Sequence, residues 1–242
     1  MLELYNSPVS TCSQKVRIVL AEKGIAWEDR RINFQAQEHL SEAYLRLNPN
    51  GVVPTLVHDG RPIVDSSVIN EYLEDLFPEP RLVPVDPYER ARMRAWRQFI
   101  DEVPTSAIRI PSFNAFVRHI WGPMSEEDFR NFTGRMPLRK HFYRKMGPEG
   151  FRKDDVDEAL EKLRATFERA EKSLSAGPWL CGEMFTLADV SLTPSIVRMV
   201  DLDLTHLWAD LPRFSDWFRR IQARPSFAIA YYPGTRQLGP AC

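Results

Sequence analysis

The sequence predicts a two-domain protein, with an N-terminal α/β domain in residues 1–80 and an all-α domain in residues 86–242. Three observations favour this division. The first part reads as strand, helix, strand and then as strand, strand, helix. The composition changes beyond Pro84, and the apolar residues that follow recur at helical spacing. The β-α-β and β-β-α order is typical of a thioredoxin-like fold, in which the active loop joins the first strand to the first helix.

The overall composition restricts the class of protein. The 242 residues, 43% of them hydrophobic, leave room for one large domain or two small ones. The net charge of −1 gives no general reason to expect nucleic acid as a partner. No apolar run approaches the roughly 18–20 residues of a membrane span, and the first residues do not resemble a signal peptide. We therefore expect no membrane partner.

Cysteine usage points to a reducing compartment. Cys12, Cys181 and Cys242 are an odd and sparse set, which argues against a disulfide framework. No spacing of cysteine and histidine resembles a zinc site, so no metal is expected. The cytoplasm is the expected location.

The stretch from Leu2 to Gly24 organises the first domain. It predicts a short strand, a polar loop broken by Pro8, and a helix that ends before Gly24. Four small polar side chains stand at the predicted start of this helix: Ser10, Thr11, Cys12 and Ser13. A helix N-terminus carries unpaired N–H groups and the positive end of the helix dipole, so it favours an anion such as a thiolate.

The remaining elements of the first domain follow from shorter signals. The sequence predicts a second strand over residues 27–33, at best a short helix within 34–47, a strand to Val57, a turn at Asp59-Gly60, a return strand over 61–64 and a helix to Leu76. Asp65 or Ser66 can cap that last helix. Pro54 stands at the entry of a strand, where it removes a ladder donor. Either this strand is an edge strand, or Pro54 is a cis proline that turns the backbone of Val53 towards a ligand.

The second domain is predicted to be helical throughout. Asp86 and Pro87 start a helix that runs to about Val103. Residues 104–150 hold five prolines and predict broken helices in a long excursion. Further helices are expected over residues 156–174, from the capping box Thr186–Asp189 with an interruption at Pro194, and over 211–221.

Four segments, in order, resemble those of a cytosolic glutathione transferase, and the similarity covers nearly the whole chain. They are STCSQKVRIVLAEKGI, similar to a serine-type active loop of the zeta class; EHLSEAYLRLNPNGVVPTLVHDG, similar to a theta-like glutathione-binding segment; DSSVINEYLEDLFPE, similar to the acid–serine pair and its helix; and FTLADVSLTP, similar to the capping-box helix. The resemblance implies the thioredoxin-like and all-α domains, a cytoplasmic homodimer, and glutathione as co-substrate.

A narrower resemblance points to bacterial β-etherases, which use glutathione to cleave β-aryl ethers in lignin-derived dimers. It rests on HDGRPIVDSSVINEYLEDLFPE, ERARMRAW, MSEEDF and RRIQARPSF. The long stretch over residues 112–150, unusual for a transferase, also fits that subfamily.

The resemblance assigns the catalytic candidates to the first loop. Ser10 and Thr11 occupy the positions of the zeta serine pair, and Ser13 occupies that of the serine in the β-etherase loop. A hydroxyl that donates to the glutathione sulfur lowers the pKa of the thiol, but each of these residues could equally be a helix cap. Cys12 could form a mixed disulfide, as omega-like members do, although Ser10 aligns with their cysteine. The alternative for Cys12 is a buried thiol.

The resemblance also implies how glutathione is held. The backbone of Val53 beside Pro54 would pair with the cysteinyl unit, and Asp65 and Ser66 would hold the γ-glutamyl end. His39 resembles the theta-like histidine that meets the glycyl carboxylate, unless it is a solvated helix-face residue. Relatives often carry lysine or glutamine at position 52 for that carboxylate, and Val52 cannot replace them.

The electrophile pocket is expected between the domains. Its candidate lining residues are Val9, Ile100, Pro104, Ala107, Ile108, Pro111, Phe113 and Phe116, with Trp121, Phe142 and Tyr143 as an aromatic wall. A basic cluster in the excursion comprises Arg135, Arg139, Lys140, Arg144 and Lys145. It reads as a solvated face, with anionic lignin fragments as the alternative partner.

The function expected from these residues is attack by a glutathione thiolate on a hydrophobic, aromatic electrophile, with β-aryl ether cleavage favoured. Three alternatives stay open. A zeta-like isomerase of a maleyl compound would need a small, cationic pocket. An omega-like thiol reductase would need Cys12 at the sulfur. A non-catalytic protein would bind only glutathione or hydrophobic ligands.

Overall fold

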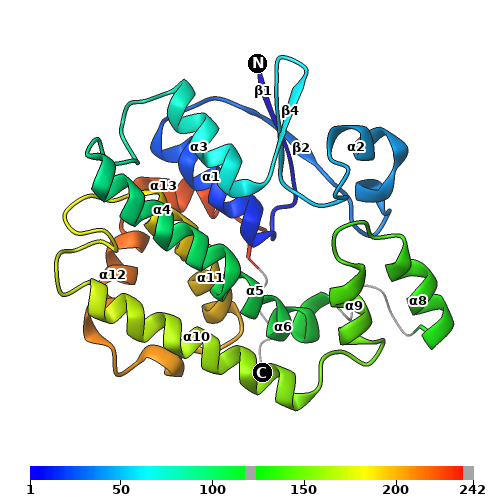
Figure 1. Ribbon diagram of the computed structural model, residues 1–242. Coiled ribbons are helices and arrows are strands. Elements are labelled where there is room, and N and C mark those ends of the chain that lie inside the picture. The colour runs from blue at the N-terminus through cyan, green and yellow to red at the C-terminus, as the bar shows by residue number, and fades with distance from the viewer. Residues whose placement is uncertain (118–123, 237–242) are drawn as a thin grey trace.

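The computed structural model describes residues 1–117 and 124–236. Its N-terminal part contains a four-stranded sheet with the strand order β2-β1-β3-β4 (Figure 1). The elements are β1 (Leu2–Asn6), α1 (Thr11–Glu22), β2 (Glu28–Arg31), β3 (Thr55–His58), β4 (Arg61–Val64) and α3 (Ser66–Leu76). β1 pairs in parallel with β2 and antiparallel with β3, which pairs antiparallel with β4. The predicted thioredoxin-like order is confirmed.

The sheet buries its apolar side chains against α1 and α3. Leu4 and Leu56 are completely buried, as are Val16 and Val19 of α1 and Leu73 of α3. Helix α1 also packs against α11 and α13 of the helical domain, so it is covered on nearly every side. The segment that carries the candidate loop is therefore held by both domains.

The segment between β2 and β3 forms only short helices. These are the 3₁₀ turn η1 (Glu38–Leu40) and helix α2 (Glu42–Leu47), whose start is capped by the Ser41 hydroxyl. The Val53–Pro54 peptide bond is cis, and Pro54 directly precedes β3. The edge-strand interpretation is wrong, because β3 lies between β1 and β4.

The second part of the chain is helical. Its elements are α4 (Pro87–Glu102), α5 (Pro104–Ala107), α6 (Arg109–Ser112), the π-helical turn η2 (Phe113–Val117), α8 (Glu126–Gly134), α9 (Lys140–Met146), α10 (Lys153–Ser173), α11 (Leu187–Asp201), η3 (Thr205–Trp208), α12 (Pro212–Gln222) and α13 (Pro225–Ala230). The Asp86 cap and the Thr186–Asp189 capping box are both present. The predicted interruption at Pro194 is wrong, because α11 continues through this residue. Packing of the buried helix against α1, α4 and α5 compensates for the one hydrogen bond that a proline removes.

The excursion forms a small unit with its own apolar cluster. Phe129, Met136, Tyr143, Met146 and Phe151 are buried together, apart from the main core. Figure 1 shows α8 and α9 beneath α2, at the right of the view. The described part of residues 104–150 thus consists of broken helices, as the prolines predict, and it extends towards the N-terminal domain.

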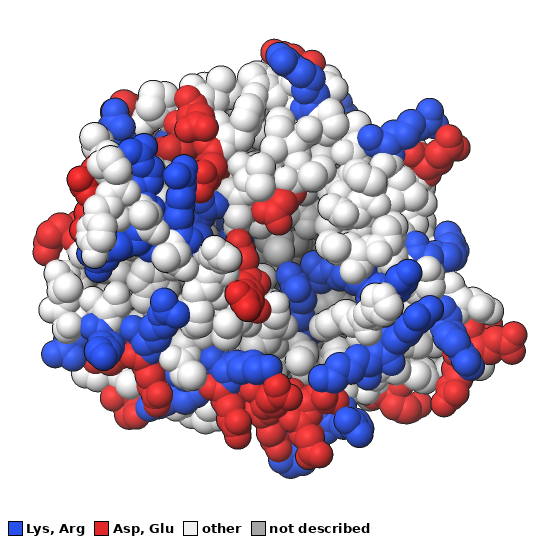
Figure 2. All heavy atoms as spheres, viewed as in Figure 1, with Lys and Arg blue, Asp and Glu red and all other residues white. Residues whose placement is uncertain are grey.

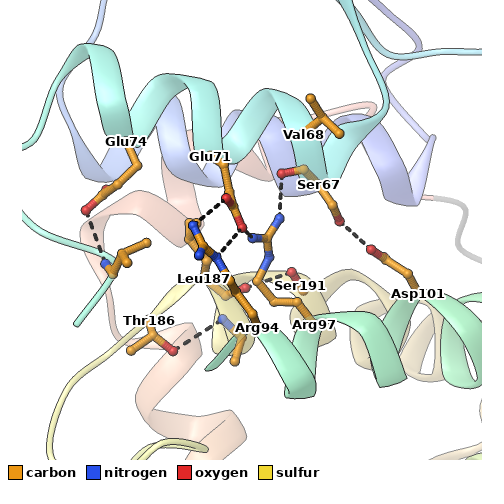
Figure 3. Close-up of polar contacts among 12 residues, drawn as sticks. Ser67, Val68, Glu71, Glu74, Arg94, Arg97, Asp101, Thr186, Leu187 and Ser191 are labelled. Atoms are coloured by element: carbon orange, nitrogen blue, oxygen red, sulfur yellow. Dashed lines mark hydrogen bonds and ion pairs between the residues drawn. The ribbon is translucent and has the colours of Figure 1, made fainter. Parts of the chain in front are cut away.

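Polar contacts join α3 to α4 across the boundary between the two parts (Figure 3). Glu71 of α3 forms ion pairs with Arg94, at 3.0 Å, and with Arg97 of α4. Asp101, near the end of α4, accepts a hydrogen bond from Ser67 and pairs with the buried ammonium of Lys15 at 2.5 Å. Because a buried charge is costly without a partner, these contacts fix α3 and α1 against α4.

Candidate active site

A cavity of about 360 Å³ lies where the β1–α1 loop meets the excursion. Its walls come from the loop and the start of α1, from residues 32–35 and 50–53, from α6 and η2, and from residues around α9. Figure 2 shows a hollow near the middle of this face, with lysine or arginine atoms along its lower edge. Apolar lining and a few convergent polar groups are the usual features of a small-molecule site.

The start of α1 presents two hydroxyl groups to the cavity. Ser10 is the N-cap, and its Oγ accepts a hydrogen bond from the Ser13 N–H at 3.3 Å. That bond uses the oxygen as acceptor and leaves the hydroxyl hydrogen available to a ligand. Ser10, Thr11 and the half-buried Cys12 all line the cavity. Ser13 is completely buried and is not among the lining residues.

Two arginines that the sequence reasoning missed hold the loop before Ser10. Arg17 donates to the carbonyls of Ser7 and Pro8, at 3.4 and 2.6 Å, and Arg198 donates to that of Val9 at 2.6 Å. Burial lowers the pKa of both arginines. In the sequence, the burial of Arg17 was indicated only by its place within the apolar run KVRIVL. Guanidinium groups from α1 and α11 therefore fix three successive loop carbonyls.

The candidates for glutathione binding lie in two places. Val53 lines the cavity, beside the cis bond to the buried Pro54. Asp65 caps α3, where its carboxylate accepts from the N–H groups of Ser67 at 2.8 Å and Val68 at 3.1 Å. Ser66 is buried at the start of that helix, and neither Asp65 nor Ser66 lines the cavity. The contacts of these four residues with glutathione stay predictions.

His39 lines the cavity from a buried position. The residue is only 4% exposed, and its ring packs on the Phe34 ring with the two centroids 4.4 Å apart. The interpretation as a solvated helix-face residue is therefore wrong. Burial, and secondarily the charge of Arg135, lower the pKa of His39 to about 4. At neutral pH this imidazole is uncharged, so it can offer a carboxylate a hydrogen bond but not an ion pair.

The low pKa of His39 predicts a pH dependence of stability. In the unfolded chain the group titrates near its usual 6.5, so between pH 6.5 and about 4 the unfolded state binds more protons. The free energy of unfolding should therefore fall as the pH drops through this window. We expect His39→Gln to flatten the slope in urea titrations from pH 7 to pH 4.5. His141→Gln, at an exposed position, is the control. Equal slopes in both variants would contradict this assignment.

The predicted pocket residues divide between the cavity and the core. Val9, Ile108 and Phe113 line the cavity. Ile100, Pro104, Ala107 and Pro111 are buried but are not lining residues, and Phe116 lies instead near the guanidinium of Arg198. The inward faces of α4 and α5 pack against the neighbouring helices, which the spacing of apolar residues cannot distinguish from a pocket wall.

The expected aromatic wall is present in part. Tyr143 lines the cavity beside Phe113, with ring centroids 5.7 Å apart. Phe142 packs behind Phe113, at 5.0 Å, and is not a lining residue. Trp121 lies outside the described residues.

Three arginines also line the cavity: Arg109, Arg139 and Arg198. Arg139 belongs to the basic cluster that reads as a solvated face, and for this residue that interpretation is wrong, since it lines the cavity. Arg144 and Lys145 of the same cluster are exposed, as a solvated face requires. The helical spacing of α9 did not reveal the position of Arg139, because this residue directly precedes the helix.

Comparisons with known proteins agree on one family. Residues 4–81 match the model of the glutathione S-transferase N-terminal domain, and residues 135–225 match that of the C-terminal domain. The chain is 29% identical to Protein LigF of Sphingobium sp. over 245 residues, covering 98% of this chain and 95% of that protein. It is 44% identical to a maleylacetoacetate isomerase of Pseudomonas aeruginosa over 240 residues, covering 95% of each.

A solved structure supports the same relationship. The crystal structure of the β-etherase LigF from Sphingobium sp. strain SYK-6 aligns with a TM-score of 0.84 at 29% identity, covering 95% of this chain and 98% of that one. None of the helices in the described residues is long and apolar enough to span a membrane. Within residues 1–117 and 124–236, no three His, Cys, Asp or Glu side chains gather as a metal site would require.

Proposed function

The chain belongs to the glutathione S-transferase family, and we propose that it activates glutathione as a thiolate for attack on an aromatic electrophile, with β-aryl ether cleavage as its reaction. In this reaction a bond forms between the glutathione sulfur and the β-carbon. The bond from that carbon to the ether oxygen breaks, and the phenolate leaves and takes a proton from water. Each step is redox-neutral and needs no metal.

One observation carries this proposal: the start of α1 and the aromatic residues Phe113 and Tyr143 line the same cavity. Val53 and His39 lie on the walls of the same cavity, where they suit the rest of the tripeptide. This arrangement supports a sulfur held by Ser10 or Thr11 and directed at an aromatic compound. Orientation and stabilisation of charge are all that the protein needs to supply.

The test is release of phenol from a neutral model β-aryl ether, measured together with consumption of glutathione. We expect one glutathione to disappear for each phenol released, and no release with S-methylglutathione, which has no thiol. Calorimetry with glutathione alone gives the second measurement. Binding of glutathione without phenol release would exclude ether cleavage and leave another transferase activity or a binding role.

A second candidate is isomerisation of a maleyl compound, which the three arginines that line the cavity favour. The similarity to the isomerase of Pseudomonas aeruginosa points the same way. The two reactions differ in the fate of glutathione. Thiolate addition, bond rotation and elimination would regenerate it, so an isomerase would turn over a maleyl compound without consuming glutathione.

We also propose that the protein acts in the cytoplasm as a homodimer. Val68 on α3 and Tyr88 on α4 are 56% and 71% exposed, respectively. We assign these two exposed side chains, on helices that contact each other, to the surface that meets the second copy of the chain.

A further inference from the structure

Arg109 and Arg139 differ from Arg17 and Arg198, the two arginines that fix the β1–α1 loop. Arg17 and Arg198 donate to loop carbonyls, and Arg198 also has the Asp201 carboxylate at 3.8 Å. Neither Arg109 nor Arg139 forms an ion pair with a carboxylate anywhere in the described ranges 1–117 and 124–236. Both line the cavity, one from α6 and the other just before α9.

The two guanidinium groups repel each other. The pKa of Arg139 lies below its ordinary value, first because of burial and then because of the charge of Arg109. Two like charges in one cavity, without a carboxylate partner among residues 1–117 and 124–236, raise the free energy of the site. A bound anion would remove this cost, and two guanidinium forks match the geometry of a carboxylate.

The position of the pair favours the electrophile over glutathione. The charges of Arg139 and Arg109 both act on the pKa of Tyr143 in the aromatic wall, and Cys12 at the start of α1 is among the groups that act on the pKa of Arg139. The residues predicted to hold the two ends of glutathione are different ones. They are His39, whose pKa responds to the charge of Arg135 and not to Arg109 or Arg139, and Asp65 and Ser66 at the start of α3, outside the cavity lining.

We propose that Arg109 and Arg139 bind a carboxylate carried by the electrophile, so that the preferred substrates are aromatic acids. This inference rests on the proposed function for the identity of the reaction. It makes substrate charge, in addition to aromatic shape, a determinant of specificity. The carboxylate is present on the substrate before the reaction, whereas the phenolate forms only as the ether bond breaks.

The first test uses two model β-aryl ethers that differ only in a carboxylic acid and its primary amide. We expect the wild type to have the higher kcat/KM with the acid. Arg109→Gln and Arg139→Gln should each lower kcat/KM for the acid by roughly 10- to 100-fold, the usual worth of a charged hydrogen bond, and change it less than about 2-fold for the amide. Arg144→Gln, at an exposed position of α9, is the control and should behave as wild type.

Further variants separate this role from a structural one. Arg139→Lys keeps the charge and should recover part of the activity with the acid. Calorimetry with glutathione should give the wild-type affinity for every variant, which also shows that each has folded. Equal losses of kcat/KM with the acid and the amide would mean that the two arginines stabilise the leaving group or only support the packing of the site. A loss of glutathione affinity would assign it to glutathione, and either result would overturn the proposal.

A binding experiment keeps the proposal testable if neither ether reacts. The probes are phenoxyacetate and phenoxyacetamide, titrated into protein saturated with S-methylglutathione. Tighter binding of phenoxyacetate to the wild type, lost in Arg139→Gln, would support the carboxylate subsite even if ether cleavage is the wrong reaction. Equal binding of both probes to both proteins would overturn the subsite whatever the reaction is.

Discussion

Asp189→Ala is expected to lower the free energy of unfolding by about 3–5 kcal/mol, because several buried hydrogen-bond donors would lose their acceptor and each unsatisfied donor costs about 1–3 kcal/mol. The Asp189 carboxylate is fully buried at the start of α11. It accepts from the N–H groups of Leu180 and Thr186, each at 2.9 Å, from the Thr186 hydroxyl at 3.2 Å and from the Trp217 indole at 2.8 Å. Alanine would leave these four donors without this acceptor in the core, and that penalty exceeds the value of the bonds themselves.

Urea unfolding measures this loss, and two further variants identify its cause. Asp216→Ala removes an exposed aspartate from α12 and should change the free energy of unfolding by less than about 0.5 kcal/mol. Asp189→Asn keeps one acceptor oxygen and turns an amide towards the other donors, so it should fall between the two. An Asp189→Ala protein as stable as Asp216→Ala would show that the capping box is not what anchors α11.

Signals that act over a few residues were predictable from the sequence. The Ser10 cap, the Asp59-Gly60 turn and the Thr186–Asp189 box each satisfy backbone groups next to them in the chain, so the residue types alone indicate the structure. The conflict between a proline and a strand predicted either an edge strand or a cis bond, and the Val53–Pro54 bond is cis. These elements fix the thioredoxin-like order and place the candidate loop at the start of α1.

Features that depend on distant neighbours were not predictable in the same way. Arg109 carries no local sign of lining a cavity, and the apolar run around Arg17 does not identify its partners, because the partners and surroundings of both residues come from other parts of the chain. Ile100 and Ile108 have similar apolar spacing, yet only Ile108 lines the cavity. Helix α11 continues through Pro194 because tertiary packing outweighs one lost hydrogen bond. Lining a cavity is a property of the assembled domains rather than of one segment.

Ser10→Ala is expected to raise the pKa of the bound glutathione thiol by roughly 1–2 units, the equivalent of one hydrogen bond to a charged sulfur. The Ser10 oxygen already accepts from the Ser13 N–H, so its hydrogen can point into the cavity. That acceptor bond polarises the hydroxyl and strengthens its donation. Loss of the hydroxyl therefore disfavours the thiolate, and kcat/KM should fall at neutral pH and recover as the pH rises.

The ultraviolet absorbance of the thiolate, titrated with pH in the glutathione complex, measures this pKa directly. Ser13→Ala is the matched control, since the Ser13 side chain is buried and does not line the cavity, and its thiol pKa should equal that of the wild type. Thr11→Ala decides whether the neighbouring hydroxyl shares the role. The Ser10 variant also loses a helix cap, at a cost of about 0.5–2 kcal/mol, so glutathione affinity must be compared as well.

An unchanged thiol pKa in Ser10→Ala with intact binding would leave the dipole of α1 and Thr11 as the sources of activation. A shift confined to Ser13→Ala would mean that the bound loop differs from the one described.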